Sequence, residues 1–211
     1  MLKQVQHDRS ILNDSPIQGV TLNSFQGLFF YLARFLKMKV LNIPGWKNSR
    51  EGHWQTIWEA SDPSVFTRIQ QDNWQHPTKE HWVPKIAQVI QQAGPDVLVT
   101  AHSIGVTAFV HAVHQYDLQI KGALLVTPSD PQHPDCPEEL KNFHEIPNKK
   151  LPFHSILVAS TNDTAIDFPK AVELAVDWQC TLQVLENAGH LTPKDGFGAW
   201  TEGKRLLKQF L

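Results

Sequence analysis

Ser103 lies in the stretch VTAHSIGV, residues 99–106, and has the surroundings expected of a nucleophile. A serine hydroxyl reacts when a base is held beside it, and one known arrangement places the serine on a sharp turn between a strand and a helix. The residues two before and two after such a serine must be small, and here they are Ala101 and Gly105. The pattern predicts a reactive serine, with an ordinary serine at a strand end as the alternative.

Asp163 and His190 follow Ser103 in the order acid and then histidine, each after a later strand-like run. The carboxyl ends of parallel strands converge at one edge of a sheet, so these side chains are expected to meet there. His190 would be the general base, and Asp163 would fix its tautomer and stabilise the imidazolium. The alternatives are an Asx-turn role for Asp163, with Asp130 or Asp167 as the acid, and a hydrogen-bonded loop histidine at 190.

Two backbone N–H groups are candidates for stabilising a developing oxyanion. Ile104 directly follows the serine, and Trp46 lies in the loop IPGWKNSREGHW after an early strand. Gly45 would let that loop approach the site closely. A simple turn at Pro44 and Gly45 is the alternative. His102, beside the serine, is expected to be a packing residue at the strand end.

The elements that must position these residues alternate along the chain. Short apolar or β-branched runs at 38–43, 65–69, 96–100, 122–127, 154–159 and 181–186 predict six strands. Helical stripes between and after them predict crossover helices near residues 54–58, 82–93, 106–113, 168–178 and 202–210. The pattern indicates an α/β fold with a mostly parallel sheet. The proline-rich region 128–152 is expected to be an irregular excursion over the sheet, too short for a cap domain.

Composition excludes several classes of function. The 19 Lys and Arg residues are scattered and balanced by 21 Asp and Glu, giving a net charge of −2 and no basic face for nucleic acid. Cys136 and Cys180 have no disulfide-framework or metal-ligand spacing, which predicts a cytoplasmic protein. The histidine pairs 76/81 and 111/114 lack an accompanying acidic ligand set, so neither a metal nor a cofactor is predicted.

The apolar segment FQGLFFYLARFL, residues 25–36, is predicted to be an amphipathic helix. It is shorter than the roughly 20 apolar residues of a membrane span. A long polar leader precedes it and no small-residue cleavage site follows, which disfavours a signal peptide. Docking on the protein's own core or on a second subunit is expected, with a membrane-surface anchor as the alternative. Residues 1–37 are therefore predicted to be an N-terminal extension to a domain over 38–211, and a homodimer is possible.

Several separated motifs resemble one family. The chain is similar, from about Met38 onward, to the small serine hydrolases of the retinoblastoma-binding protein nine and YdeN type. The motifs stand here as IPGWKNSREGHWQTIWE, QDNWQHP, AHSIG, NDTAIDF and NAGHLTPKDGFGAWTEG. The resemblance implies a three-layer α/β-hydrolase fold without a cap domain. It also implies a catalytic set of Ser103, Asp163 and His190, with Thr164 where members commonly have proline.

The same resemblance implies a substrate pocket lined by aromatic side chains. Trp46, Trp74 and Phe197 are expected to line it, whereas Trp54 and Trp58 lie on a helical stripe and are expected in the core. The expected activity is hydrolysis of a small ester, thioester or amide through an acyl-enzyme on Ser103. A non-catalytic protein-binding homologue is the alternative, although no L-x-C-x-E motif is present.

Overall fold

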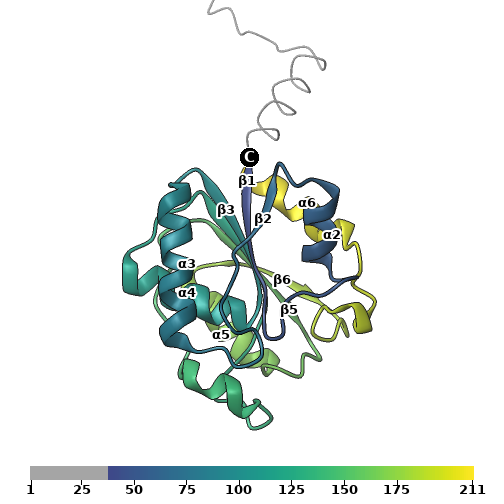
Figure 1. Cartoon of the computed structure of the whole chain (residues 1–211). Helices are drawn as coiled ribbons and strands as arrows, with labels where there is room; N and C mark the ends of the chain where they lie inside the picture. The colour runs from purple at the N-terminus through teal and green to yellow at the C-terminus, as the bar shows by residue number, and fades with distance from the viewer. Residues whose placement is uncertain (1–37) are drawn as a thin grey trace, which may run out of the picture.

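Six parallel strands form the central sheet of the computed structural model, which describes residues 38–211 (Figure 1). Their order across the sheet is β2-β1-β3-β4-β5-β6, and every neighbouring pair is parallel. The strands span Lys39–Ile43 (β1), Phe66–Arg68 (β2), Val97–Ser103 (β3), Gly122–Pro128 (β4), Ser155–Ser160 (β5) and Thr181–Leu185 (β6). All six predicted strands are confirmed.

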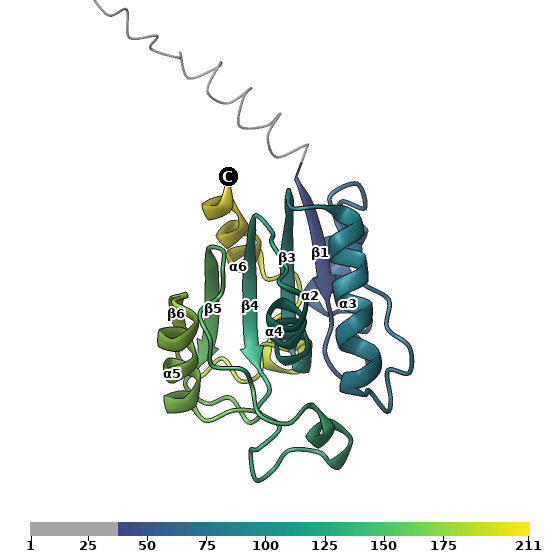
Figure 2. The same cartoon turned by 90° about the vertical axis from the view of Figure 1, so that its left-hand side faces the viewer.

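Helices cover both faces of this sheet (Figure 2). On one face lie α3 (Lys79–Ala93), α4 (Ile104–Tyr116) and α5 (Phe168–Trp178). On the other lie α2 (Trp54–Ser61), α6 (Thr201–Leu206) and the 3₁₀ turn η3 (Leu207–Phe210). Every residue of β3 and β4 is buried as a result, which explains their continuous apolar sequence. The predicted three-layer α/β-hydrolase fold is confirmed.

The excursion after β4 crosses the carboxyl edge of the sheet. It contains one 3₁₀ helix, η1 (Glu138–Phe143), and no further helix or strand. Asn142 fastens it to the start of α3, because its side chain accepts from the Lys79 N–H at 2.8 Å and donates to the Pro77 carbonyl at 3.0 Å. The excursion therefore forms one wall over the sheet edge without a separate domain.

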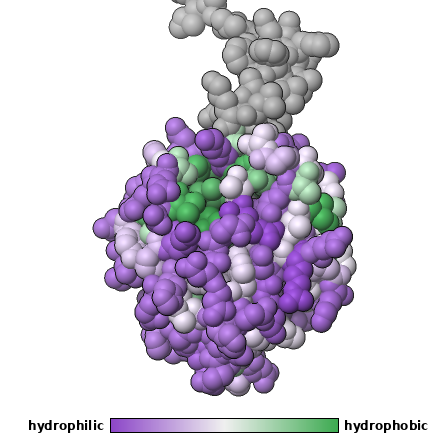
Figure 3. Space-filling model, in the orientation of Figure 1, coloured by the Kyte–Doolittle hydropathy of each residue, from purple (hydrophilic) through white to green (hydrophobic). Residues whose placement is uncertain are grey.

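The edge of the sheet where the strands begin lies opposite that wall. The face in Figure 3 is mostly hydrophilic, and its hydrophobic area gathers toward the amino ends of the strands. No helix within residues 38–211 has the length and apolar character to cross a membrane. The predicted extension over residues 1–37, with its amphipathic helix at 25–36, lies outside the described residues.

Candidate active site

Ser103 ends β3 in a conformation that L residues rarely adopt, with φ 59° and ψ −134°, and α4 begins at the next residue. The sharp turn brings the backbone very close to the loop after β1. A Cβ on Gly105 would lie 2.5 Å from the Pro44 carbonyl oxygen, and one on Gly45 would lie 2.7 Å from the Ser103 Cβ. Ala101 is fully buried in the core. The strict demand for glycine thus falls on positions 45 and 105, while position 101 accommodates a methyl group.

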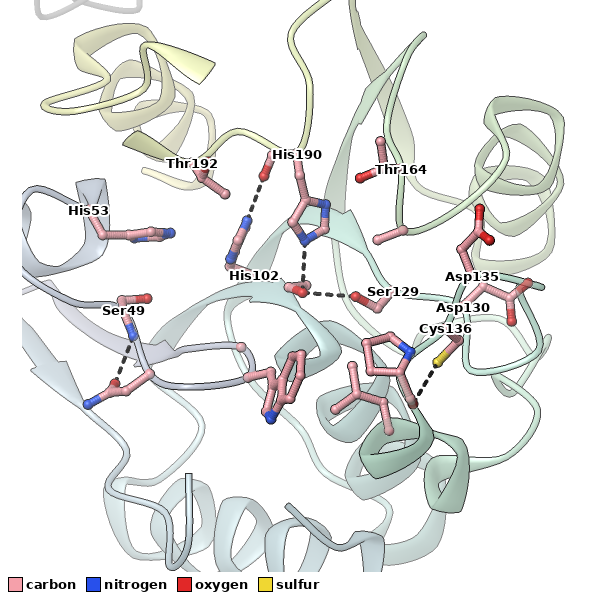
Figure 4. A pocket seen from close by; sticks show the side chains of 17 residues that line it. Ser49, His53, His102, Ser129, Asp130, Asp135, Cys136, Thr164, His190 and Thr192 are labelled. Atoms are coloured by element: carbon pink, nitrogen blue, oxygen red, sulfur yellow. Dashed lines mark hydrogen bonds between the residues drawn. The ribbon is translucent and has the colours of Figure 1, made fainter. Parts of the chain in front are cut away.

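His190 and Asp163 form a hydrogen-bonded line with the serine. The Ser103 Oγ lies 2.9 Å from His190 Nε2, and His190 Nδ1 lies 2.8 Å from Asp163 Oδ1 (Figure 4). The Asp163 side chain is 1% exposed and the His190 side chain 19%. An ionised carboxylate can only accept, so Nδ1 carries the proton and Nε2 is left to accept from the serine hydroxyl. The structure therefore brings the three predicted residues together in the expected order.

The rival acids do not contact His190. Asp130 accepts from the backbone N–H of Gln132 at 2.9 Å, and Asp167 lies 3.7 Å from His133. Asp163 also accepts from the Ala165 N–H at 2.9 Å, so the Asx-turn role is present together with the histidine contact. That turn holds the Asp163 carboxylate in place beside His190.

The two predicted oxyanion donors belong to the start of α4 and to the loop after β1. Ile104 is the first residue of α4, so its N–H has no intrahelical partner, and the positive end of the helix dipole points toward Ser103. Trp46 lies in the loop after β1, beside Gly45, and its indole Nε1 donates to the Gln75 carbonyl at 2.8 Å. Ile104 directly follows the serine and Trp46 lines the same cavity, and the role of both N–H groups in catalysis stays a prediction.

A half-buried arginine holds the loop after β1 in place. Arg68 donates from Nη1 to Asn48 Oδ1 at 2.8 Å and to the Ser49 carbonyl at 2.9 Å. Its Nη2 forms an ion pair with Glu59 at 2.7 Å. The sequence analysis did not single out this residue, because an arginine at the end of a strand has no motif of its own.

Three histidine rings lie in contact beside the serine. The His102 ring is 4.9 Å from those of both His53 and His190, centre to centre. His102 was predicted as a packing residue, yet its Nε2 also donates to the His190 carbonyl at 2.9 Å. Burial, and then the charge of Arg68, lowers the pKa of His53 to about 3, and burial lowers the pKa of His102 well below 6.5. Both rings are therefore neutral where His102 contacts His190.

Ser129 is a further polar contact that the sequence analysis missed. It directly follows β4, and its hydroxyl lies 2.8 Å from the Ser103 hydroxyl. Thr107 on α4 donates to the Ser129 carbonyl at 2.7 Å. The sequence could have indicated Ser129, because it follows β4, the strand beside β3. Polar residues at the carboxyl ends of neighbouring parallel strands lie close together.

Ser103 opens into a cavity of about 360 Å³. One wall comes from the loop after β1, one from the excursion after β4, and the roof from the loops of Asp163 and His190. The lining residues are Gly45, Trp46, Asn48, Ser49, His53, His102, Ser103, Ser129, Asp130, Asp135, Cys136, Pro137, Leu140, Thr164, Ala165, His190 and Thr192.

Two of the three aromatic residues predicted for the pocket lie elsewhere. Trp46 lines the cavity, but Trp74 packs edge-on against Trp82 of α3 at 5.3 Å, and its carbonyl accepts the Lys47 N–H. Phe197 packs on Trp200 in the core of the opposite face. Neither Trp74 nor Phe197 lines this cavity, and each packs against another aromatic side chain instead.

The histidine pairs do not form a metal-ligand cluster. Within residues 38–211, no three His, Cys, Asp or Glu side chains converge as a metal site would require. His114 Nε2 is instead within hydrogen-bond distance of the Lys149 carbonyl at 3.1 Å.

The sequence of the protein matches one family over most of its length. The family described as serine hydrolase matches residues 40–209. The chain belongs to the serine hydrolase family. No curated protein sequence matches the chain.

Solved structures with the same fold include YdeN-type proteins. A YdeN-like hydrolase from Pectobacterium atrosepticum is 28% identical, with 87% of this chain and 96% of that chain covered and a TM-score of 0.75. The ydeN gene product from B. subtilis is 21% identical, with 82% and 98% covered and a TM-score of 0.66. A monoacylglycerol lipase from Paleococcus ferrophilus is 11% identical, with 81% and 93% covered, and shares the fold at a TM-score of 0.61. The protein is thus a member of the serine hydrolase family whose fold is similar to that of these YdeN-type structures.

Proposed function

We propose that this hydrolase cleaves a small ester, thioester or amide through an acyl-enzyme on Ser103. The observation that carries the proposal is the line of hydrogen bonds from Ser103 through His190 to the buried Asp163. A serine held 2.9 Å from an oriented imidazole is within reach for proton transfer as it attacks.

In the first half-reaction, the Ser103 oxygen bonds to the substrate carbonyl carbon while His190 Nε2 takes the hydroxyl proton. The carbonyl oxygen becomes an oxyanion, which the N–H groups of Ile104 and Trp46 would stabilise. His190 then gives its proton to the leaving oxygen, sulfur or nitrogen as the bond to the carbonyl carbon breaks. Asp163 stays ionised and stabilises the imidazolium throughout.

In the second half-reaction, water attacks the acyl-enzyme and gives a proton to His190. The bond from the carbonyl carbon to Ser103 breaks, the serine recovers its proton, and a carboxylic acid leaves. The neutral state of His53 and His102 supports this cycle, because neither ring opposes the charge that forms on His190.

The size of the cavity supports small acyl groups. At about 360 Å³ it lies near the lower end of the range for small-molecule sites. We expect the enzyme to act in the cytoplasm, where its unpaired Cys136 and Cys180 would stay reduced.

A fluorophosphonate probe tests the proposal directly, since it phosphonylates an activated serine. The wild-type protein is expected to label and to hydrolyse short nitrophenyl esters, and Ser103→Ala is expected to lose both. A folded wild-type protein that does not label, or a Ser103→Ala variant that labels equally, would contradict the proposal. The first of these results would favour a non-catalytic binding protein.

A further inference from the structure

A second cavity adjoins the first and differs from it in charge. It has a volume of about 760 Å³ and shares Trp46, Asn48, His53 and Thr192 with the first cavity. The shared residues make the two cavities neighbouring arms of one site. They are called the catalytic arm, which contains Ser103, and the basic arm.

The basic arm takes its name from three cationic side chains. Lys47, Arg50 and Lys194 line it together with a single carboxylate, Glu51. The catalytic arm has no lysine or arginine in its lining and has two carboxylates, Asp130 and Asp135. A substrate lying across both arms would therefore meet positive charge at one end and negative charge at the other.

The cations of the basic arm are not used to hold the fold together. The ion pairs found within residues 38–211 involve other side chains, so Lys47, Arg50 and Lys194 have no carboxylate partner there. Lys47 lies with its Nζ 3.6 Å from the centre of the Trp46 ring. This contact keeps one charge at the junction of the two arms.

The loop of His190 shows which part of the substrate the basic arm faces. Thr192 and Lys194 follow His190 closely in the chain and line this arm. In Figure 4, Thr192 and His53 lie on one side of His190, whereas Asp130, Asp135 and Cys136 lie on the other. His190 must protonate the leaving group, so an arm built from its own loop is suited to receive that group.

His53, at the junction, offers an unused hydrogen-bond donor. Its Nδ1 accepts from the Gln55 N–H at 3.2 Å, so in the neutral ring the proton lies on Nε2. Nε2 is buried without a partner within the described residues, and the whole residue is only 6% exposed. An unpaired buried donor is uncommon, and an acceptor on a bound molecule would supply the partner that it lacks.

From these observations we propose that the basic arm binds the leaving group of the substrate and that this leaving group carries an anion, such as a carboxylate. The inference rests on the proposed function of Ser103. The acyl part would be neutral or cationic, since a carboxylate there would face Asp130 and Asp135.

Three acetate or succinate esters provide the test. Para-acetoxyphenylacetate and para-acetoxyphenylacetamide differ only in the charge of the leaving group, and phenyl hemisuccinate has its carboxylate on the acyl part. The enzyme is expected to favour the first over the second by about tenfold in kcat/KM, the sum of a few exposed charge contacts. The hemisuccinate is expected to be the poorest substrate. Raising the salt concentration to about 1 M should remove most of this preference through screening.

Paired variants identify the residues responsible. Arg50→Gln combined with Lys194→Gln should bring the ratio of carboxylate to carboxamide close to one. The matched control is Lys39→Gln with Lys121→Gln, which removes two charges at the amino ends of β1 and β4, opposite the site, and should leave the ratio unchanged.

The possible outcomes separate the two proposals. Hydrolysis of both acetate esters at equal kcat/KM in a Ser103-dependent reaction overturns the inference and leaves the proposed function intact. A preference that survives in the Arg50 and Lys194 variant also overturns it. Absence of any Ser103-dependent hydrolysis overturns both proposals.

Discussion

At the scale of single residues, the role proposed for Ser103 requires a backbone conformation that lowers stability. Its backbone, with φ 59°, lies in the region that favours glycine, and such conformations cost on the order of 1–3 kcal/mol. The cost is tolerated because the turn projects the hydroxyl at His190.

We therefore expect Ser103→Gly to be more stable than Ser103→Ala, by about 1 kcal/mol in the free energy of unfolding. Both variants lose the same hydroxyl contacts, so their difference isolates the backbone. Urea denaturation of the two proteins measures it. If the alanine variant is the more stable, the turn is not strained.

Asp163 permits a second prediction at this scale. Asp163→Asn should lower kcat by about a thousandfold or more, because an amide at this position would favour the wrong tautomer of His190. Its stability and KM should change much less. Steady-state kinetics measure this effect, with Asp167→Asn, which removes a rival acid that does not contact His190, as the control. Equal losses in both variants would argue against the assigned role.

The residues of the hydrogen-bonded line were predictable, whereas most of the cavity was not. Ser103, Asp163 and His190 each follow a strand that apolar sequence alone predicts, so their meeting is a consequence of parallel topology. Trp74 and Phe197 failed as pocket residues because aromatic side chains serve core and cavity equally well. Whether such a side chain lies in the core or lines the cavity is shown only by its packing partner, which is Trp82 for Trp74 and Trp200 for Phe197.

At the scale of elements, side chains at strand ends connect the loops of the site. The Asn162 Oδ1, in the loop after β5, accepts from the Gly189 N–H in the loop after β6 at 2.8 Å. His102, near the end of β3, donates to the His190 carbonyl at 2.9 Å, and Thr127 of β4 donates to the same oxygen at 3.4 Å. The loop of the proposed general base, His190, is thus fixed from three strands.

The His102 contact can be tested by substitution. His102→Leu should lower kcat by about tenfold to a hundredfold with little change in KM, because a small displacement of His190 weakens a reaction that depends on its position. His102→Gln retains a donor of similar reach and should keep most of the activity. Kinetics of both variants, with circular dichroism to verify folding, check this. Equal loss in the two variants would mean that ring packing, and not the hydrogen bond, is what matters.

For the excursion after β4, the sequence predicts the irregular path but not the residues that reach the cavity. Its prolines and mixed charge correctly indicated an irregular path. Its contribution of Asp135, Cys136 and Leu140 to the cavity could not be predicted, because no periodicity places such a segment.

At the scale of the whole molecule, buried and half-buried neutral histidines make stability depend on pH. The pKa of His53 is lowered to about 3 and that of His111 to about 4, mainly by burial, and the pKa of His102 is lowered well below 6.5. In the unfolded chain these rings take up protons near pH 6.5, so below that pH the unfolded state binds more protons than the folded one. Stability is therefore full above pH 6.5 and decreases as the pH falls toward 4.

We expect the free energy of unfolding to fall between pH 6.5 and pH 5 by about 1.4 kcal/mol per pH unit for each histidine that stays neutral. Urea denaturation at several pH values measures the slope. His102→Gln should reduce that slope by the share of one histidine. A stability that does not change over this range would show that these rings gain protons in the folded state.

The distribution of the site over the sheet also bears on how the protein is made. The end of β3 and the loops after β1, β4, β5 and β6 supply lining residues, and strands that pair in the sheet are separated along the chain by long connections. Such pairings form slowly, because long loops must close before any contact compensates for them. In a chain emerging from the ribosome, the proposed nucleophile at residue 103 is present long before the proposed base at residue 190 and the strand that precedes it. Hydrolytic activity should therefore be absent from every partly synthesised or partly folded form. The proposed activity would begin only once the whole sheet has formed.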